Sequence, residues 1–241
     1  MENKFTYILI NGTDLTGKTV LSNNLTQDFG FLIQNSYFTK NHPLNKLATQ
    51  LRKEKLSGKF SEESINALHS YAKDGDPVLQ KLIEDLYPVI SDEIIGHLYA
   101  NAAAEEIATF NPKENIIQDS SSVLKSYVIH KSLGTDRRLV DKLENLLSIH
   151  PKPSKPNFSI LLEADLDAKR ARLEKRYKNG ELYMSDTDEI IFRNPDLAIE
   201  QAKIMKDVTN HVFPNTTIID TTKLTEEQVH DEVRNHLELG K

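Results

Sequence analysis

One eight-residue stretch near the amino terminus constrains this chain more than any other feature. The residues from Gly12 to Thr19 (GTDLTGKT) fit the pattern of a glycine, four residues, and then Gly-Lys followed by Ser or Thr. A loop of this spacing turns successive backbone N–H groups toward phosphate oxygens, and the helix that follows presents its positive end to the same anion. The pattern therefore predicts a phosphate-binding loop, or P-loop, between a strand and a helix.

The flanking residues provide the context that such a loop needs. The run from Phe5 to Asn11 (FTYILIN) is short, apolar and rich in strand-forming residues, and it stops at Gly12. This indicates a buried strand that ends in a tight loop. A helix is expected from Gly17 to about Asp28. A chance match in a glycine-containing turn is the alternative interpretation, and this context argues against it.

Four more runs have the character of buried strands: Phe31–Ile33, Asn115–Asp119, Phe158–Ala164 and Thr216–Asp220. They lie too far apart for hairpins, and helical patterns separate them. This alternation predicts an α/β fold with a five-stranded parallel sheet covered by helices on both faces. A chain of 241 residues with 38% hydrophobic content is long enough for one large core. We therefore expect residues 1–241 to form a single domain.

Two helical segments have recognisable boundaries. Apolar residues recur at helical spacing from about Asp76 to Phe110 and are interrupted by Pro88, which predicts one kinked helix or two abutting ones. The last helix is expected from Thr225 to Leu239. It opens with Thr225 followed three residues later by Gln228, which fits a capping box.

Composition narrows the function classes. The formal net charge of −6 gives no general attraction for nucleic acid or for an anionic membrane, and neither partner is expected. The absence of cysteine excludes disulfides, thiolate metal sites and a cysteine nucleophile. No apolar run approaches the roughly 18 residues of a membrane span. A cytoplasmic enzyme or binding protein is the expectation.

The P-loop assigns chemical roles to its residues. Lys18 is expected to reach the β- and γ-phosphates of ATP, and the Thr19 hydroxyl is expected to ligate Mg²⁺. ATP and Mg²⁺ are therefore the expected cofactors. The residues expected to bind the nucleotide are Gly12, Thr13, Asp14, Leu15, Thr16, Gly17, Lys18 and Thr19, with Arg170 from a later helix.

Beyond the P-loop, the chain resembles the thymidylate kinase family of nucleoside monophosphate kinases along nearly its whole length. The similar segments are GTDLTGKT in the P-loop, Phe38 to Leu47, His97 to Glu106, Ser159 to Arg176, and Ile218 to Asp220 with the helix that follows. The resemblance implies the P-loop kinase fold with a short lid at about residues 177–194, and it suggests a homodimer built through helices. It places Asp14 near the acceptor's sugar hydroxyl, and Lys40 where an arginine usually binds the acceptor phosphate.

The chain departs from the family at two arginine positions. The family has an Asp-Arg pair after the third strand, whereas Asp119 is followed here by Ser120. The helix beside the acceptor usually carries an Asn-Arg pair, and the aligned residues are Ala103 and Ala104. Each lost arginine removes charge-assisted hydrogen bonds worth about 1.5–3 kcal/mol to a phosphate. This favours a less anionic acceptor such as a nucleoside, or one held by other residues, for which the candidates are Lys40, Arg52 and Arg137.

Asp119 lies at the carboxyl end of a predicted central strand. There it is expected to accept the proton of an acceptor hydroxyl or to hold Mg²⁺ through water. The alternative is that Asp119 caps the helix that starts near Ser121. Asp14 has a similar alternative, because aspartate also stabilises turns.

The helix after the fourth strand is rich in arginine. Arg172 and Arg176 lie four residues apart and share a face. We expect the arginine-rich face of this helix, which also carries Arg170, to stack on adenine and to clamp phosphates when the lid closes. A solvated helix with internal ion pairs is the alternative. Arg193, in the lid, is a further candidate.

Taken together, these residues predict an ATP-dependent small-molecule kinase that transfers the γ-phosphate to a nucleoside or a nucleoside-monophosphate-like acceptor. The predicted catalytic residues are Lys18, Asp119, Arg172 and Arg176, and the predicted metal ligands are Thr19 and Asp119. A catalytically weakened nucleotide-binding regulator and an NTP-hydrolysing P-loop protein are the alternatives. A GTP switch is disfavoured because the chain has no Asn-Lys-x-Asp stretch.

Overall fold

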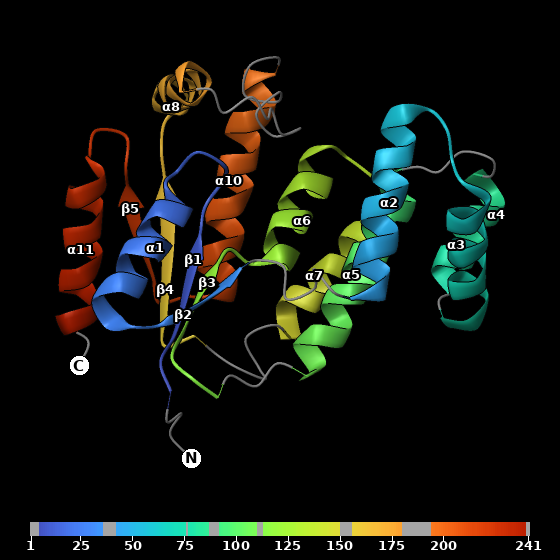
Figure 1. Cartoon of the computed structure of the whole chain (residues 1–241), viewed down its shortest axis with the longest axis horizontal. Coiled ribbons are helices and arrows are strands. Elements are labelled where there is room, and N and C mark those ends of the chain that lie inside the picture. Colours follow the sequence, from blue (N-terminus) through green and yellow to red (C-terminus); the bar gives the residue numbers. More distant parts are fainter. Residues whose placement is uncertain are drawn as a thin grey trace.

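The computed structural model describes residues 5–35, 42–75, 77–86, 92–109, 113–149, 156–179 and 194–239. Its centre is a five-stranded sheet in which all the paired strands run parallel (Figure 1). The strands are β1 (Tyr7–Asn11), β2 (Leu32–Asn35), β3 (Ile116–Asp119), β4 (Phe158–Glu163) and β5 (Thr216–Asp220). All five predicted strands are therefore confirmed, with ends that differ by at most two residues.

The strand order is β2-β3-β1-β4-β5. The chain places β2 and β3 on one side of β1 and then crosses to the other side for β4 and β5. Such a reversal leaves a crevice at the carboxyl end of the strand where it occurs, and ligands of open α/β sheets bind there. In this chain that strand is β1, which leads directly into the P-loop.

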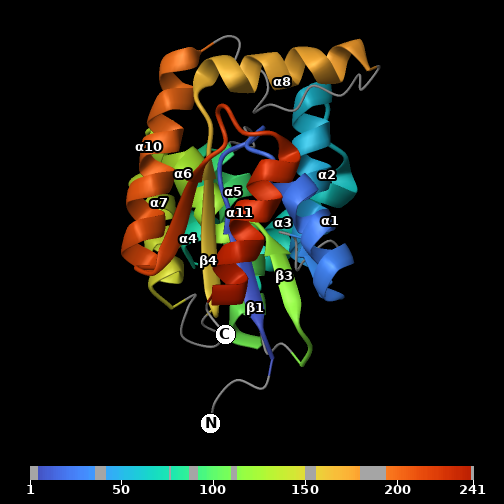
Figure 2. The ribbon, with the colours of Figure 1, turned by 90° about the vertical axis from the view of Figure 1, so that its left-hand side faces the viewer.

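Helices cover both faces of the sheet (Figures 1 and 2). The helices are α1 (Lys18–Phe29), α2 (Pro43–Ser57), α3 (Glu62–Gly75), α4 (Pro77–Leu86), α5 (Asp92–Thr109), α6 (Ser122–Ser132), α7 (Arg137–Ile149), α8 (Leu166–Lys178), α10 (Pro195–Val212) and α11 (Glu226–Leu239). The segment expected as one kinked helix or two abutting ones contains α4 and α5, and Pro88 lies outside the described residues. Within the described residues, no helix is both long enough and apolar enough to span a bilayer.

Alternating side chains of the strands build the two layers of core. On β4, Ile160 and Leu162 point to the layer formed with α1 and α11, whereas Leu161 points to the layer formed with α5, α6, α7 and α10. Successive side chains of a strand face opposite sides of a sheet. Because both faces are covered, the strands read as nearly continuous apolar runs, which explains why the sequence revealed them.

A further hydrophobic core lies beside the sheet. Helix α5 contributes to this core and also to the layer formed with α6, α7 and α10. Leu98 and Ala102 of α5 pack among α2, α3 and α4, while Ala103 and Ile107 of the same helix pack toward α6 and α7. A helix that is apolar on all sides must be buried between neighbours. Figure 1 shows α2, α3 and α4 beyond α5, on the side away from β5.

Helix ends follow the predicted local chemistry. The Thr225 N–H donates to Gln228 Oε1 at 2.9 Å, and the Gln228 N–H donates to Thr225 Oγ1 at 3.2 Å, which confirms the capping box before α11. α1 begins one residue after Gly17, whose φ of 95° is in the left-handed region that glycine tolerates.

The burial of side chains on the central strands predicts how truncating one of them changes the free energy of unfolding. Ile160→Ala on β4, where the side chain is 1% exposed, should lower the free energy of unfolding by roughly 2–5 kcal/mol because it leaves a cavity in the core. The matched control is Ile199→Ala on α10, where the side chain is 57% exposed and the expected change is within about 0.5 kcal/mol. Urea denaturation followed by circular dichroism measures both, and equal effects would contradict this assignment of the core.

Candidate active site around the P-loop

The P-loop has the backbone shape that its glycines predict. Gly12 has a φ of 149°, and a Cβ atom there would lie 2.6 Å from the Leu162 carbonyl oxygen of β4. Only a residue without a side chain fits this close approach of the loop to the neighbouring strand. Leu15 also has a positive φ, at 65°, and its side chain is buried against Leu173 and Ala198. The loop is therefore anchored at Gly12 by the sheet and at Leu15 by α8 and α10.

Lys18 folds back over the loop. Its Nζ donates to the Thr13 carbonyl oxygen at 2.7 Å, and Thr16 Oγ1 donates to the same oxygen at 2.9 Å. Burial of the ammonium lowers the pKa of Lys18 to about 8, while the carboxylates of Asp14 and Asp119 act in the opposite direction. An ammonium that has lost part of its hydration gains from an anion that replaces water. Its position suits contact with a phosphate bound by the loop.

Thr19 and Asp119 lie side by side, as expected for a shared metal site. Thr19 Oγ1 donates to Asp119 Oδ2 at 2.8 Å across the boundary between α1 and β3. Hydroxyl and carboxylate oxygens are the hard ligands that Mg²⁺ prefers, and waters and phosphate oxygens complete such sites. These two residues therefore have the right chemistry to hold Mg²⁺ beside the loop.

The capping alternative for Asp119 is wrong. The N-cap of α6 is Ser121, whose side chain accepts a hydrogen bond from the Leu124 N–H at 3.3 Å. Asp119 lies two residues earlier, and its Oδ2 faces Thr19 instead. Between the two, Ser120 has a φ of 79°, and its N–H donates to the Ile10 carbonyl oxygen at 2.7 Å. This hydrogen bond prolongs the pairing with β1 and leaves the chain a single residue for the turn into α6.

Asp14 forms an ion pair that the sequence did not reveal. Lys125 Nζ of α6 lies 2.9 Å from Asp14 Oδ1, with the two side chains 34% and 21% exposed. The contact joins residues 111 positions apart in the sequence. It connects the P-loop to the helix that follows the Asp119 strand.

α8 lies across the carboxyl ends of the strands and contributes two further cations (Figure 2). Lys169 Nζ donates to Thr13 Oγ1 at 2.7 Å, and burial lowers its pKa. Arg172 Nη1 donates to the Leu15 carbonyl oxygen at 2.8 Å, and its Nη2 donates to the Thr221 carbonyl oxygen at 2.6 Å. Arg172 therefore connects the P-loop to the segment after β5. Its predicted catalytic role stays a prediction.

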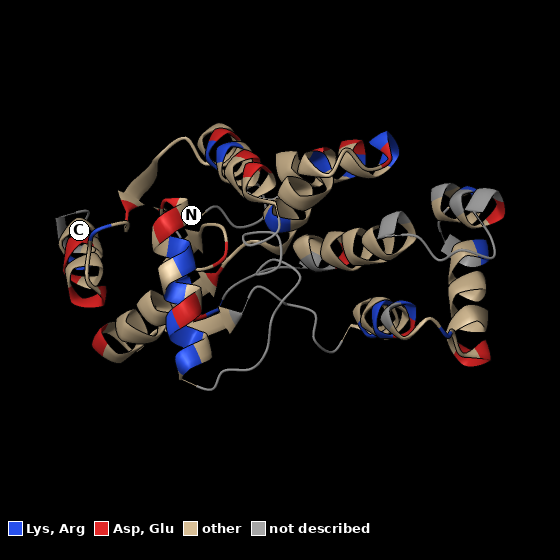
Figure 3. Cartoon of the chain, turned by 90° about the horizontal axis from the view of Figure 1, so that it is seen from above, with Lys and Arg blue, Asp and Glu red and all other residues tan. Residues whose placement is uncertain are grey.

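The predicted arginines on α8 do not share one environment. Arg170 is half-buried and Arg176 is exposed, whereas Arg172 contacts the P-loop. Viewed from above, basic and acidic residues alternate along α8 (Figure 3). The roles of Arg170 and Arg176 in binding and catalysis stay predictions. Most of the lid expected at residues 177–194, including Arg193, lies outside the described residues.

The candidates for holding an acceptor phosphate are also dispersed. Arg52 is exposed on α2, and Arg137 is exposed on α7, 3.6 Å from Asp141. Lys40 lies outside the described residues. Ala103 and Ala104, which replace the family's Asn-Arg pair, pack into or against the core formed by α5, α6 and α7.

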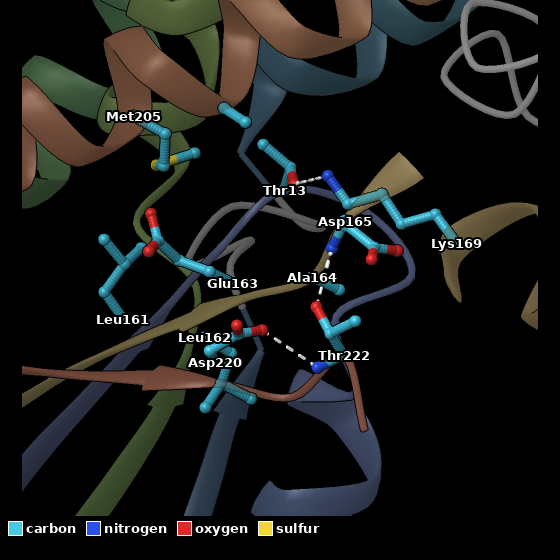
Figure 4. Close-up of a pocket in the computed structure, with 11 residues that line it drawn as sticks. Thr13, Leu161, Leu162, Glu163, Ala164, Asp165, Lys169, Met205, Asp220 and Thr222 are labelled. Atoms are coloured by element: carbon cyan, nitrogen blue, oxygen red, sulfur yellow. Dashed lines mark hydrogen bonds between the residues drawn. The ribbon is translucent and has the colours of Figure 1, made fainter. Parts of the chain in front are cut away.

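A cavity of about 260 Å³ adjoins the loop at the carboxyl ends of β4 and β5 (Figure 4). Thr13 and Lys169 form one side of it, and Met205 of α10 lines another. Two acidic side chains, Glu163 and Asp220, also line it. Glu163 is paired with Lys206 at 2.8 Å, and Asp220 accepts from the Thr222 N–H at 2.9 Å.

Sequence reasoning missed Lys125 and Lys169. The signal for Lys169 was present, because Lys169 and Leu173 lie four residues apart and both are buried on the same side of α8. If Leu173 is used to identify the buried face of α8, Lys169 is placed on that face. Nothing in the local sequence of α6 distinguishes Lys125 from a solvated lysine, since its partner is in the P-loop.

Comparison with known proteins supports the fold. No protein-family model matches the chain, and no curated protein sequence matches it. Among solved structures, a thymidylate kinase from Candida albicans is similar, with a TM-score of 0.59 and 16% identity over 98% of this chain and 92% of that chain. Deoxyadenosine kinase from M. mycoides with bound dATP is also similar, with a TM-score of 0.55 and 13% identity over 97% of this chain and 100% of that one.

The same deoxyadenosine kinase with bound dCTP has a TM-score of 0.54 and 15% identity over 97% of this chain and 99% of that chain. All of these alignments extend over nearly the full length of both chains. At this level of identity the likeness shows the fold alone, and that fold is the one of the thymidylate kinase-like P-loop kinases.

Proposed function

We propose that this protein is an ATP- and Mg²⁺-dependent kinase that transfers the γ-phosphate to a nucleoside or a nucleoside-monophosphate-like acceptor. The observation that carries the proposal is the pairing of Thr19 with Asp119 beside a P-loop that holds Lys18. A phosphate-binding loop by itself serves hydrolysis as well as transfer. A carboxylate at the end of the adjacent strand adds a group that can act on an acceptor hydroxyl.

In the proposed reaction the acceptor oxygen forms a bond to the γ-phosphorus, and the bond from that phosphorus to the β,γ-bridging oxygen breaks. The hydroxyl proton goes to the Asp119 carboxylate or through water to solvent, and ADP leaves. In this proposal Lys18 contacts the phosphate oxygens and Asp14 orients the acceptor hydroxyl. Thr19 and Asp119 would hold Mg²⁺, which would supply positive charge beside the phosphates.

Correct positioning of the two substrates accounts for most of the rate enhancement in such reactions, because the transferred group needs little covalent chemistry from the protein. The P-loop amides, Lys18 and the Thr19–Asp119 pair all lie at the crevice beside β1, where two substrates can meet in line. The similarity in fold to kinases of nucleosides and nucleotides supports an acceptor of that class. A homodimer and a cytoplasmic location belong to the same proposal and stay predictions.

A screen of acceptors tests the proposal directly. The protein is incubated with ATP, Mg²⁺ and a panel of nucleosides, nucleoside monophosphates and sugars, and ADP release is followed. ADP that appears only with an acceptor supports the kinase. Hydrolysis that is independent of acceptor would identify an NTP-hydrolysing protein instead, and tight ATP binding without turnover would identify a nucleotide-binding regulator.

Removal of the P-loop lysine should abolish turnover. Lys18→Ala should lower kcat by at least about 100-fold, because the ammonium is a preorganised contact to the transferred phosphate. Its thermal stability should change little, since burial already disfavours the charged side chain in the folded protein. The control is Lys203→Ala at an exposed position of α10. Retained activity in Lys18→Ala would remove the P-loop from the mechanism.

The pKa of Lys18 predicts how nucleotide affinity depends on pH. With a value of about 8 in the free protein, Lys18 is charged below pH 8 and loses its proton above it. Because the bound phosphate favours the charged form, MgATP affinity should be highest below pH 8 and should fall by up to about 10-fold per pH unit above it. Isothermal titration calorimetry from pH 7 to 9.5 measures this. The Lys18→Arg variant stays charged throughout and should show no such slope.

The proposed role of Asp119 gives a separate prediction. Asp119→Asn should lower kcat by roughly 100-fold or more while changing MgATP affinity much less, because the amide cannot accept the acceptor's proton. Asp141→Asn, a surface change on α7, is the matched control. A near-normal kcat in Asp119→Asn would reduce Asp119 to a hydrogen-bond partner of Thr19.

A further inference from the structure

The residue that directly follows Asp119 cannot bring a cation to the site. Ser120 is 4% exposed, and its N–H is held by the Ile10 carbonyl oxygen. Its φ of 79° lies in the left-handed region, which is unfavourable for a residue with a side chain. Its short hydroxyl side chain carries no charge. Any cation on this side of the P-loop must therefore come from another position.

Lys125 reaches the P-loop from the start of α6. Ser121 caps the helix, and the Lys125 N–H donates to the Ser121 carbonyl oxygen at 2.9 Å, so Lys125 belongs to the first helical turns after β3. From there its Nζ lies 2.9 Å from Asp14 Oδ1. The first turns of α6, which follow β3 and Asp119 in the chain, therefore also place an ammonium group beside the P-loop.

Lys125 and Lys18 act on neighbouring residues of the loop. Lys18 Nζ donates to the Thr13 carbonyl oxygen, and Lys125 Nζ pairs with the carboxylate of Asp14. The Lys125 charge contributes to lowering the pKa of Lys18, whereas Asp14 raises it. The two ammonium groups therefore contact the adjacent residues Thr13 and Asp14 of the loop.

On the basis of the function proposed above, we infer that Lys125 is a second phosphate-contacting lysine. When ATP binds, the Lys125 ammonium moves away from the Asp14 carboxylate and contacts the γ-phosphoryl group. A γ-phosphoryl group carries more negative charge than one carboxylate, so it competes well for the ammonium. The pair is 34% and 21% exposed, so the exchange costs little compared with that of a buried pair. The flexible four-carbon stem of lysine allows the movement. Asp14, once released, is available to the acceptor hydroxyl.

The inference predicts a difference between ATP and ADP, because ADP lacks the γ-phosphoryl group. Lys125→Met keeps a long apolar side chain without charge. It should weaken MgATP binding by roughly 10- to 100-fold and leave MgADP binding unchanged within about 2-fold. Lys125→Arg should retain most of the ATP affinity. Isothermal titration calorimetry measures both nucleotides in each variant.

The matched control lies on the same helix. Lys131 Nζ donates to Tyr127 OH in the last turn of α6, and Lys131→Met should bind both nucleotides like the wild type. Equal losses of ATP and ADP affinity in Lys125→Met would show that Lys125 only holds Asp14 and the loop in place. No loss of ATP affinity would also overturn the inference.

Asp14→Asn gives an independent test that does not depend on the folding of Lys125→Met. Removing the carboxylate frees Lys125 for phosphate, so MgATP affinity should rise or stay equal, and weaker ATP binding would contradict the inference. The proposed function can fail separately. Absence of acceptor-dependent ADP release in the wild type would refute the kinase, while the comparison of ATP with ADP would still decide the role of Lys125.

Discussion

The close approach of Gly12 to β4 is the constraint on which the rest of the site depends. A Cβ atom at residue 12 would lie 2.6 Å from the Leu162 carbonyl oxygen, and the φ of 149° suits glycine. This contact lets the chain leave β1 and turn at once into the loop that precedes α1. Lys18 and Thr19 are positioned relative to that turn, because they belong to the first turn of α1.

The loop is held in place from a second side by α8. Leu15 inserts its side chain against Leu173 and Ala198, and Arg172 binds both the Leu15 carbonyl oxygen and Thr221. A loop that must present several N–H groups at once benefits from such external support, because its own backbone includes a strained position at Leu15. α8 therefore contributes to the site by fixing the loop, in addition to any contact it makes with a nucleotide.

The charges around the loop have different tasks. Lys18 and Lys169 are directed at Thr13, Lys125 is directed at Asp14, and Arg172 is engaged with backbone oxygens. Basic groups therefore gather at this loop although the whole chain has a formal charge of −6. Local concentration of positive charge is what an anionic ligand requires in a protein without general attraction for anions.

Several features of this protein could be predicted from the sequence because their causes are local. The five strands are apolar runs buried on both faces, the P-loop is a fixed spacing of glycines with Lys18 and Thr19, and the capping box of α11 lies within four residues. Asp119 was placed correctly beside the loop because the carboxyl ends of parallel strands meet at one edge of the sheet.

The tertiary structure alone decided which of several lysine and arginine side chains contact the P-loop. Lys125 contacts Asp14, 111 residues away in the sequence. Arg172 donates to the Leu15 carbonyl oxygen, whereas Arg176 is exposed. It also excluded Asp119 as a helix cap, since the strained turn at Ser120 moves the cap to Ser121. Such outcomes depend on how elements that are distant in the sequence pack together. A local sequence pattern gives the spacing of residues within one helix or strand, but it does not give the distance between two such elements.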